Sequence, residues 1–333
     1  MIAQIDREYL NYGAARALRR IASYGLYEGR PLTTKGRFIN PLVFAWLHTL
    51  AAVPGKPEVN QPVFITGLGR SGTTILGILL SLHHKVGYLN EPKALWHVID
   101  ARQDINGNYS CSGARFRLGA VDATAEIACR AQRLFARYLG LTGARRVVDK
   151  YPELIFRVSY VQKLLPDAKF IFITRSGADA VPSVVKWSER LGVQSGGHTD
   201  DWWGRDDIKW NYLREQLILG DAAYESIWPV VTPDLDHANR AALEWIVTMR
   251  EGLAQSQRYP DAVVRIAYED MLKNPAGELE RLQRLCGLEP DPAVADYARK
   301  RLYDNPAKDW PDLHPAVDAL FRATMQELGY ATP

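Results

Sequence analysis

A glycine-rich turn with hydroxyl side chains gives the first chemical expectation. Residues 67–74 read Gly-Leu-Gly-Arg-Ser-Gly-Thr-Thr, directly after the apolar, β-prone run 63–65 and before the apolar run 75–82. This pattern predicts a strand, a loop and the N-terminus of a buried helix. Such a loop directs several backbone N–H groups into one concavity, and the helix end adds partial positive charge. We therefore expect a phosphate or sulfate group to bind here.

Two known spacings fit this loop, and the first is the dinucleotide fingerprint. Gly67, Gly69 and Gly72 satisfy it, and Glu91 follows near the distance at which that fold places an acid for the ribose. The dinucleotide fingerprint predicts an NAD(P)-dependent oxidoreductase.

The second spacing is that of the P-loop. The run from Gly67 to Gly72 and Thr74 satisfies it, but Thr73 stands where the phosphate-binding lysine belongs. The missing lysine argues against a P-loop kinase or an ATP-binding protein. Arg70 and the two threonine hydroxyls still supply hydrogen-bond donors for a less charged anion.

A second strand and helix carry another pair of anion-binding side chains. Residues 168–174 predict a buried strand that ends at Arg175, and a helix is expected to begin near Asp179. Ser183 then lies about one turn into that helix. Arg175 and Ser183 are therefore placed to hold one phosphate group together.

A carboxylate and a lysine follow two further predicted strands. Residues 85–89 predict a strand with Glu91 at its carboxyl end, and residues 145–150 predict another that ends with Lys150. Open α/β sheets place their reacting groups at this edge. Glu91 is a candidate base, a ribose ligand or a surface residue, and Lys150 either approaches the bound anion or only ends its strand.

Composition narrows the classes of function. The chain has 333 residues, 47% of them hydrophobic, which is enough for a sizeable core. A net charge of +3 and a pI near 8.6 are too mild for nucleic-acid binding but suit a basic cleft. The three cysteines follow no metal or disulfide spacing, which fits a reducing compartment. The first residues show no apolar signal core, so we expect a cytoplasmic protein.

The N-terminal region differs from the rest of the chain in the elements that its sequence predicts. Residues 1–61 are predicted to form a helical extension packed on the core, ending in a turn at 54–57, and residues 62–333 form the main α/β domain. The run 42–53 is the most apolar, yet it is shorter than the ~20 residues of a membrane span. It predicts a core helix or a helix at an interface, so residues 1–53 are expected to contact a membrane surface at most, without spanning it.

The remaining elements follow from periodicity and turn residues. Residues 187–240 are interpreted as an insertion rich in tryptophan and tyrosine, a composition suited either to holding a ring-bearing acceptor or to packing. The other expected segments are an irregular stretch at 100–119, helices at 122–138, 241–253 and 276–286, and a strand at 263–266.

Several of these segments resemble one known family. The run 70–74, Arg-Ser-Gly-Thr-Thr, and the run 88–92, Tyr-Leu-Asn-Glu-Pro, resemble the sulfotransferases that use 3′-phosphoadenosine 5′-phosphosulfate (PAPS), in particular their carbohydrate and tyrosylprotein branches. The resemblance covers about residues 62–310 in scattered segments. It implies a three-layer αβα domain with a central parallel sheet and a P-loop-like phosphosulfate loop.

The resemblance also implies a reaction and a donor. The enzyme would transfer the sulfuryl group of PAPS to an acceptor hydroxyl on a carbohydrate, a lipid or another small molecule, releasing 3′,5′-adenosine bisphosphate without a metal ion. Catalysis would fall to Glu91, Arg70 and Lys150. The donor would be held by Gly69, Arg70, Ser71, Gly72, Thr73, Thr74, Arg175, Ser183 and Lys308.

The chain departs from the family pattern at three places. Tyr151 replaces a threonine after Lys150, Ser176 and Gly177 replace the Asp-Pro that follows the arginine, and Ala267 replaces an arginine before the Tyr-Glu-Asp segment. The second change removes a proline that fixes the turn next to Arg175.

Overall fold

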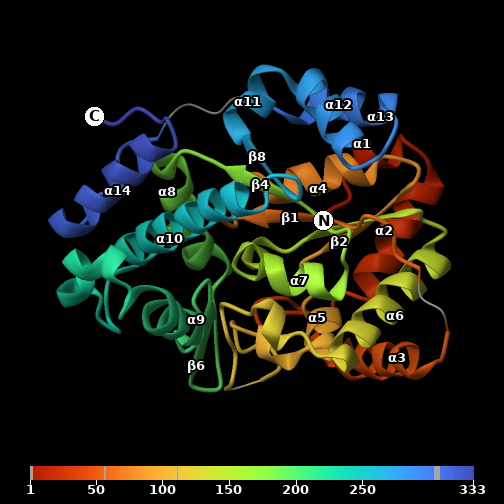
Figure 1. The fold of residues 1–333 in the computed structure, drawn as a ribbon, viewed down its shortest axis with the longest axis horizontal. Helices are drawn as coiled ribbons and strands as arrows, with labels where there is room; N and C mark the ends of the chain where they lie inside the picture. The colour runs from red at the N-terminus through yellow and green to blue at the C-terminus, as the bar shows by residue number, and fades with distance from the viewer. Residues whose placement is uncertain (1–2, 56–57, 111, 304–307) are drawn as a thin grey trace.

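A five-stranded parallel sheet lies at the centre of the computed structural model, which describes residues 3–55, 58–110, 112–303 and 308–333 (Figure 1). The strand order is β2-β3-β1-β4-β8. The strands are β1 (Val63–Gly67), β2 (Val86–Asn90), β3 (Arg146–Lys150), β4 (Lys169–Thr174) and β8 (Val263–Ala267). Helices cover both faces, so the predicted three-layer αβα fold is confirmed.

Successive apolar side chains of each strand point to opposite faces of the sheet, so both faces must be covered. Val63 and Ile65 of β1 pack into one core cluster, and Phe64 between them packs into the other. Strand β4 repeats this alternation, with Ile171 and Ile173 on the first face and its phenylalanines on the second. Parallel strands buried on both faces need apolar residues at every position, which is how these runs read in the sequence.

The helices divide between the two faces. One cluster contains residues of α1 (Arg7–Leu10), α2 (Ala14–Leu26), α4 (Thr73–Ser81), α11 (Tyr268–Lys273), α12 (Pro275–Leu285) and α13 (Pro292–Arg301). The other contains residues of α3 (Asn40–Ala52), α5 (Lys93–Ile99), α6 (Ala125–Thr142), α7 (Val158–Leu164), α8 (Gly177–Leu191), α9 (Ile208–Leu213), α10 (His237–Arg258) and α14 (Pro315–Glu327).

Element boundaries shift from the expected ones by a few residues. The helix expected near Asp179 begins at Gly177, and the helix expected at 241–253 is the much longer α10. Asp236 accounts for the early start of α10, because its side chain accepts hydrogen bonds from the amides of Ala238 and Asn239. Part of the turn expected at 54–57 lies outside the described residues.

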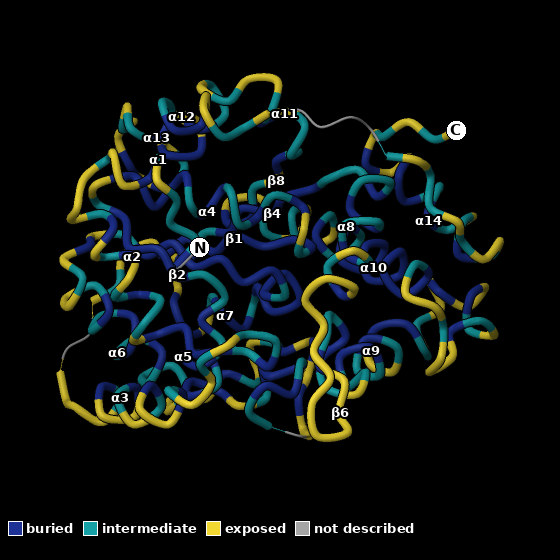
Figure 2. The backbone as a smooth tube through the Cα atoms, turned by 180° about the vertical axis from the view of Figure 1, so that it is seen from behind, coloured by how far each residue is buried: buried dark blue, intermediate teal, exposed yellow. Residues whose placement is uncertain are grey.

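The predicted insertion contains structure that periodicity did not reveal. Strands β5 (Val193–Ser195), β6 (His198–Asp201) and β7 (Gly204–Arg205) form a small antiparallel sheet. Figure 2 shows this hairpin as a mostly exposed projection beside α9. Strands of two to four residues are too short to give an alternating pattern.

Helix α3 combines the two features that its sequence suggested, a buried face in the core and an exposed apolar face. Val43, Leu47 and Leu50 are buried at helical spacing, whereas Leu42 is 75% exposed and Phe38, just before the helix, is 84% exposed. No helix among the described residues is both long and apolar enough to cross a membrane. Surface contact through residues 1–53 stays a prediction.

A buried ion pair ties the N-terminal helices to the sheet. The Arg20 guanidinium donates to both carboxylate oxygens of Glu28, at 2.5 and 3.0 Å, and both side chains are almost fully buried. Glu28 also accepts the backbone N–H of Asn90, at the end of β2, at 2.8 Å. Its own carbonyl accepts the N–H of Ala94. The pair therefore holds the backbone on both sides of Glu91.

This burial predicts a large difference between two Arg–Glu pairs. Glu28→Ala leaves a buried arginine without its counter-charge, so the free energy of unfolding should fall by about 3 kcal/mol or more. Glu126→Ala is the matched control, because the Arg130–Glu126 pair lies on the surface of α6 and its loss should cost about 0.5 kcal/mol or less. Urea unfolding followed by circular dichroism measures both values. Equal losses would contradict the structural role assigned to Glu28.

Candidate active site

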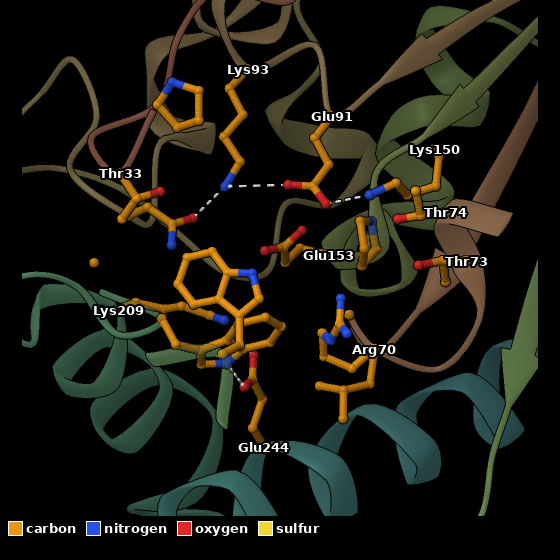
Figure 3. Close-up of a pocket in the computed structure, with 18 of the residues that line it drawn as sticks. Thr33, Arg70, Thr73, Thr74, Glu91, Lys93, Lys150, Glu153, Lys209 and Glu244 are labelled. Atoms are coloured by element: carbon orange, nitrogen blue, oxygen red, sulfur yellow. Dashed lines mark hydrogen bonds and ion pairs between the residues drawn. The ribbon is translucent and has the colours of Figure 1, made fainter. Parts of the chain in front are cut away.

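A polar cavity of about 320 Å³ opens at the carboxyl ends of β1, β2 and β3 (Figure 3). Because the strands are parallel, the loops that follow them meet at this one edge. The lining residues that matter below are Thr33, Gly67, Gly69, Arg70, Thr73, Thr74, Glu91, Lys93, Lys150, Glu153, Trp187, Trp202, Lys209 and Glu244.

The predicted anion loop runs from β1 into α4 as expected. Gly72 has φ of 89°, a left-handed conformation that favours glycine, and a Cβ there would lie 2.2 Å from the Tyr268 ring. A Cβ on Gly69 would lie 2.5 Å from the Trp202 ring. Two aromatic rings thus pack closely against the loop, and a side chain larger than that of glycine would collide with them at either position.

The loop retains unsatisfied hydrogen-bonding capacity. Gly72 caps α4 without any side-chain hydrogen bond, which leaves the first-turn amides available to a ligand. The Ser71 hydroxyl is buried and has no partner among the described residues. Thr73 is buried as well, and the side chains of Thr73 and Thr74 line the cavity. These groups fit a bound phosphate or sulfate.

The predicted arginine and serine lie next to this loop. The Arg175 guanidinium donates to the carbonyl oxygen of Arg70 at 2.8 Å and stacks over the Tyr268 ring at 4.7 Å. The Arg70 side chain in turn donates to the Ser183 hydroxyl at 3.2 Å. Strand β4 and helix α8 therefore bring Arg175 and Ser183 to the glycine loop, beside the cavity lining rather than within it.

Lys308 joins the same cationic group. Its ammonium donates to the carbonyl oxygen of Asp179 at 2.9 Å. Burial, and then the positive charge of Arg175, lowers the pKa of Lys308. Partial loss of water, together with the charges of Arg190 and Arg175, lowers the pKa of Arg70. Cations that repel one another in this way favour the binding of a multiply charged anion.

A carboxylate and a lysine face the cavity from the neighbouring strands. Glu91 has φ of 47°, and its N–H donates to the carbonyl oxygen of Lys150 at 2.7 Å. The Glu91 carboxylate is 34% exposed and accepts a hydrogen bond from the Lys150 ammonium, which is only 3% exposed. Lys93 lies 3.9 Å from the other Glu91 oxygen and donates to Asn106 at 2.7 Å. Figure 3 shows this row of groups.

The charges around Glu91 decide its ionisation. Burial disfavours the carboxylate, but Lys150 and Lys93 together outweigh burial and lower the pKa of Glu91 to about 2. Glu91 is therefore ionised at neutral pH, held mainly by Lys150.

The insertion supplies one wall of the cavity. Trp187 and Trp202 meet edge to face with ring centres 5.4 Å apart, and both line the cavity. The Trp202 N–H donates to Glu244 at 2.6 Å, and Lys209 pairs with the same carboxylate at 2.5 Å. Trp203 and other aromatic residues of the insertion are fully buried instead. Aromatic residues of the insertion therefore both line the cavity and pack in the core.

Several cavity residues were not expected from the sequence. Lys93 lies two residues after Glu91, and Glu153 lies three residues after Lys150. Their closeness to the end of a strand was the one sequence signal that could have indicated a place in the cavity. Lys209 and Glu244 come from distant helices, and only the fold pairs them. The N-terminal segment also reaches the cavity, at Gln4 and residues 31–34.

The parallel sheet carries an anion loop, an arginine–serine pair and a strand-end carboxylate at one edge, an arrangement suited to a transfer reaction on an anionic donor. Comparison with known proteins agrees with this class: the chain belongs to the sulfotransferase family, whose profile matches residues 62–218 and 221–292.

The curated relatives match over short segments. The nodulation protein NoeE of Sinorhizobium fredii is 28% identical over 118 residues, which is 34% of this chain and 28% of NoeE. Protein-tyrosine sulfotransferase 1 of Danio rerio is 28% identical over 127 residues, which is 37% of this chain and 35% of that protein. The chain thus spans about a third of these relatives.

Solved sulfotransferase structures match over more of the length but at low identity. The sulfotransferase domain of the Synechococcus PCC 7002 olefin synthase is 16% identical with a TM-score of 0.47, covering 84% of this chain and 98% of that one. Sulfotransferase STF1 of Mycobacterium tuberculosis is 16% identical with a TM-score of 0.46, covering 97% and 93%.

The low pKa of Glu91 predicts how its contribution to stability depends on pH. The pKa falls from 4.5 to about 2 on folding, so the ionised carboxylate stabilises the folded protein above pH 4.5. This contribution is lost as the pH falls from 4.5 towards 2. The melting temperature of the wild type should therefore exceed that of Glu91→Gln at neutral pH, and the difference should shrink below pH 4.5.

Differential scanning fluorimetry from pH 7 to pH 2.5 measures this difference. Glu225→Gln, at an exposed position of the insertion, is the control for the loss of one carboxylate. A difference between the wild type and Glu91→Gln that persists unchanged at pH 2.5 would contradict the assigned ionisation.

Proposed function

We propose that this protein transfers the sulfuryl group of PAPS to an acceptor hydroxyl by in-line displacement. One observation carries the proposal: the glycine loop, the Arg175–Ser183 element and the Glu91–Lys150 pair converge at one edge of the sheet. Membership of the sulfotransferase family supports it.

The donor side of the site fits a nucleotide that carries two separated anionic groups. The amides at the start of α4, with the buried hydroxyls of Ser71 and Thr73, suit the 5′-phosphosulfate. Arg175 has a buried Nε–H without a partner among the described residues, and together with Ser183 it suits the 3′-phosphate. Lys308 would add a further cation next to this phosphate.

PAPS supplies the sulfuryl group as an electrophile when it is bound. Glu91 is proposed to accept the proton of the acceptor hydroxyl, and Arg70, Lys150 and the loop amides to offset the negative charge that develops on the leaving phosphate. In the free protein Lys150 holds Glu91 in its ionised, weakly basic form. A donor oxyanion that competes for Lys150 would raise the pKa of Glu91 towards that of an effective base.

The acceptor side suits a small molecule with at least one hydroxyl group. The whole cavity, which the anion loop also lines, has a volume of about 320 Å³, at the lower end of the range for ligand sites. Indole rings stand beside carboxylate, amide and ammonium groups, so a carbohydrate, a phenol or the polar head of a lipid is compatible with the cavity.

The family match argues against the NAD(P)-dependent oxidoreductase considered from the glycine spacing. In that reading Glu91 would bind a ribose, whereas here its carboxylate contacts Lys150 and Lys93. The Arg175–Ser183 element also has no part in that chemistry.

Glu91→Gln tests the base directly. Because the amide accepts no proton, transfer of labelled sulfate from PAPS should fall by about 100-fold or more, while the affinity for 3′,5′-adenosine bisphosphate changes little. Glu225→Gln is the control. Turnover equal to that of the wild type would remove Glu91 from this role.

Arg175→Ala tests the donor site. Loss of one charged hydrogen bond to the 3′-phosphate should weaken the binding of 3′,5′-adenosine bisphosphate by about tenfold or more, with little change for adenosine 5′-monophosphate. Isothermal titration calorimetry gives both affinities. Arg145→Ala is the matched control, because Arg145 is exposed just before β3, at the opposite edge of the sheet. An unchanged preference for the bisphosphate would remove Arg175 from the proposed site.

A further inference from the structure

Glu153 is a cavity residue with no hydrogen-bond or ion-pair partner among the residues that the structure describes. It lies in the short 3₁₀ helix Pro152–Arg157, three residues after Lys150. Figure 3 shows its carboxylate projecting into the cavity, with no interaction drawn to it. Its Oε2 atom is buried and accepts no hydrogen bond from any described residue.

An unpartnered carboxylate oxygen limits what the cavity can bind. A carboxylate accepts hydrogen bonds and donates none, and burial without a donor is unfavourable. Oε2 itself is enclosed by protein, but the side chain lines the cavity, so a ligand can supply a donor to the side of the carboxylate that faces it. A hydroxyl or an ammonium group would compensate this carboxylate, whereas a second carboxylate would not.

The neighbouring charges further limit which ligands the cavity can bind. Three lysines line the cavity away from the anion loop, and each already lies beside a carboxylate. Lys150 and Lys93 contact Glu91, and Lys209 contacts Glu244. Glu153 has no cation within contact distance among the described residues. An anionic acceptor beside Glu153 would therefore meet a negative charge that no described cation contacts, and every lysine of this part of the cavity already has a carboxylate neighbour.

We propose that Glu153 determines acceptor specificity by accepting a hydrogen bond from a hydroxyl or ammonium group of the acceptor and by repelling acceptors with a carboxylate nearby. This inference rests on the proposed sulfuryl transfer. It narrows the acceptor to neutral or ammonium-bearing hydroxyl compounds.

Two sets of matched acceptors test the inference. The first is 4-methylphenol, tyramine and 4-hydroxyphenylacetate, and the second is a methyl glucoside, its 6-amino-6-deoxy analogue and the corresponding glucuronide. Within each set one substituent at one ring position is neutral, positively charged or negatively charged. Labelled PAPS gives kcat/KM for each acceptor with the wild type, Glu153→Gln and the control Glu225→Gln. Thermal shifts of the 3′,5′-adenosine bisphosphate complex report acceptor binding without turnover.

The wild type should use or bind the carboxylate-bearing member of a set at least about tenfold less well than the others. Glu153→Gln should reduce this discrimination by about tenfold, with unchanged affinity for 3′,5′-adenosine bisphosphate. A large preference for the ammonium over the neutral member identifies an ionic contact, and equal use identifies a hydroxyl contact.

Three outcomes would overturn the inference. The wild type could prefer the carboxylate-bearing acceptors. The Glu153→Gln variant could discriminate against these acceptors as strongly as the wild type does. Finally, the wild type could bind 3′,5′-adenosine bisphosphate yet neither use nor bind any acceptor of the two sets. Absence of bisphosphate binding is a distinct result, because it refutes the sulfotransferase proposal itself.

Discussion

Three partly buried cations, Arg70, Arg175 and Lys308, gather at the end of β1 beside a helix N-terminus, and their closeness shapes the whole site. Burial, and then the positive charge of neighbouring side chains, lowers the pKa of Arg70 and of Lys308. Such a cluster is costly in the free protein, and a polyanion relieves it. The glycine loop, the pressed aromatic rings and the Arg175 contact with Arg70 all serve to hold these groups in place.

A different balance holds on the acceptor side. There the three lysines, Lys93, Lys150 and Lys209, face the three carboxylates of Glu91, Glu153 and Glu244, so the charges balance and the cavity attracts an anion only at the loop. Under the proposed function, an electropositive donor half and a charge-balanced acceptor half would give one site two distinct selectivities. The buried Arg20–Glu28 pair supports this division, because it fixes the backbone on both sides of Glu91.

Features encoded by local patterns could be predicted from the sequence. The buried strands, the turn at Gly72 and the strand-end position of Glu91 each depend on a few consecutive residues, and the structure has them where expected. Features that depend on tertiary contacts could not. Nothing in the sequence distinguishes Trp202, which lines the cavity, from the buried Trp203, and the pairing of Lys209 with Glu244 across the fold leaves no local signal.

A crystal structure with 3′,5′-adenosine bisphosphate would locate the donor. We expect the 5′-phosphate to receive hydrogen bonds from the amides of residues 72–74, and the 3′-phosphate to contact Arg175 and Ser183. A bisphosphate bound elsewhere, or one whose 3′-phosphate points away from Arg175 into solvent, would refute the proposed donor site.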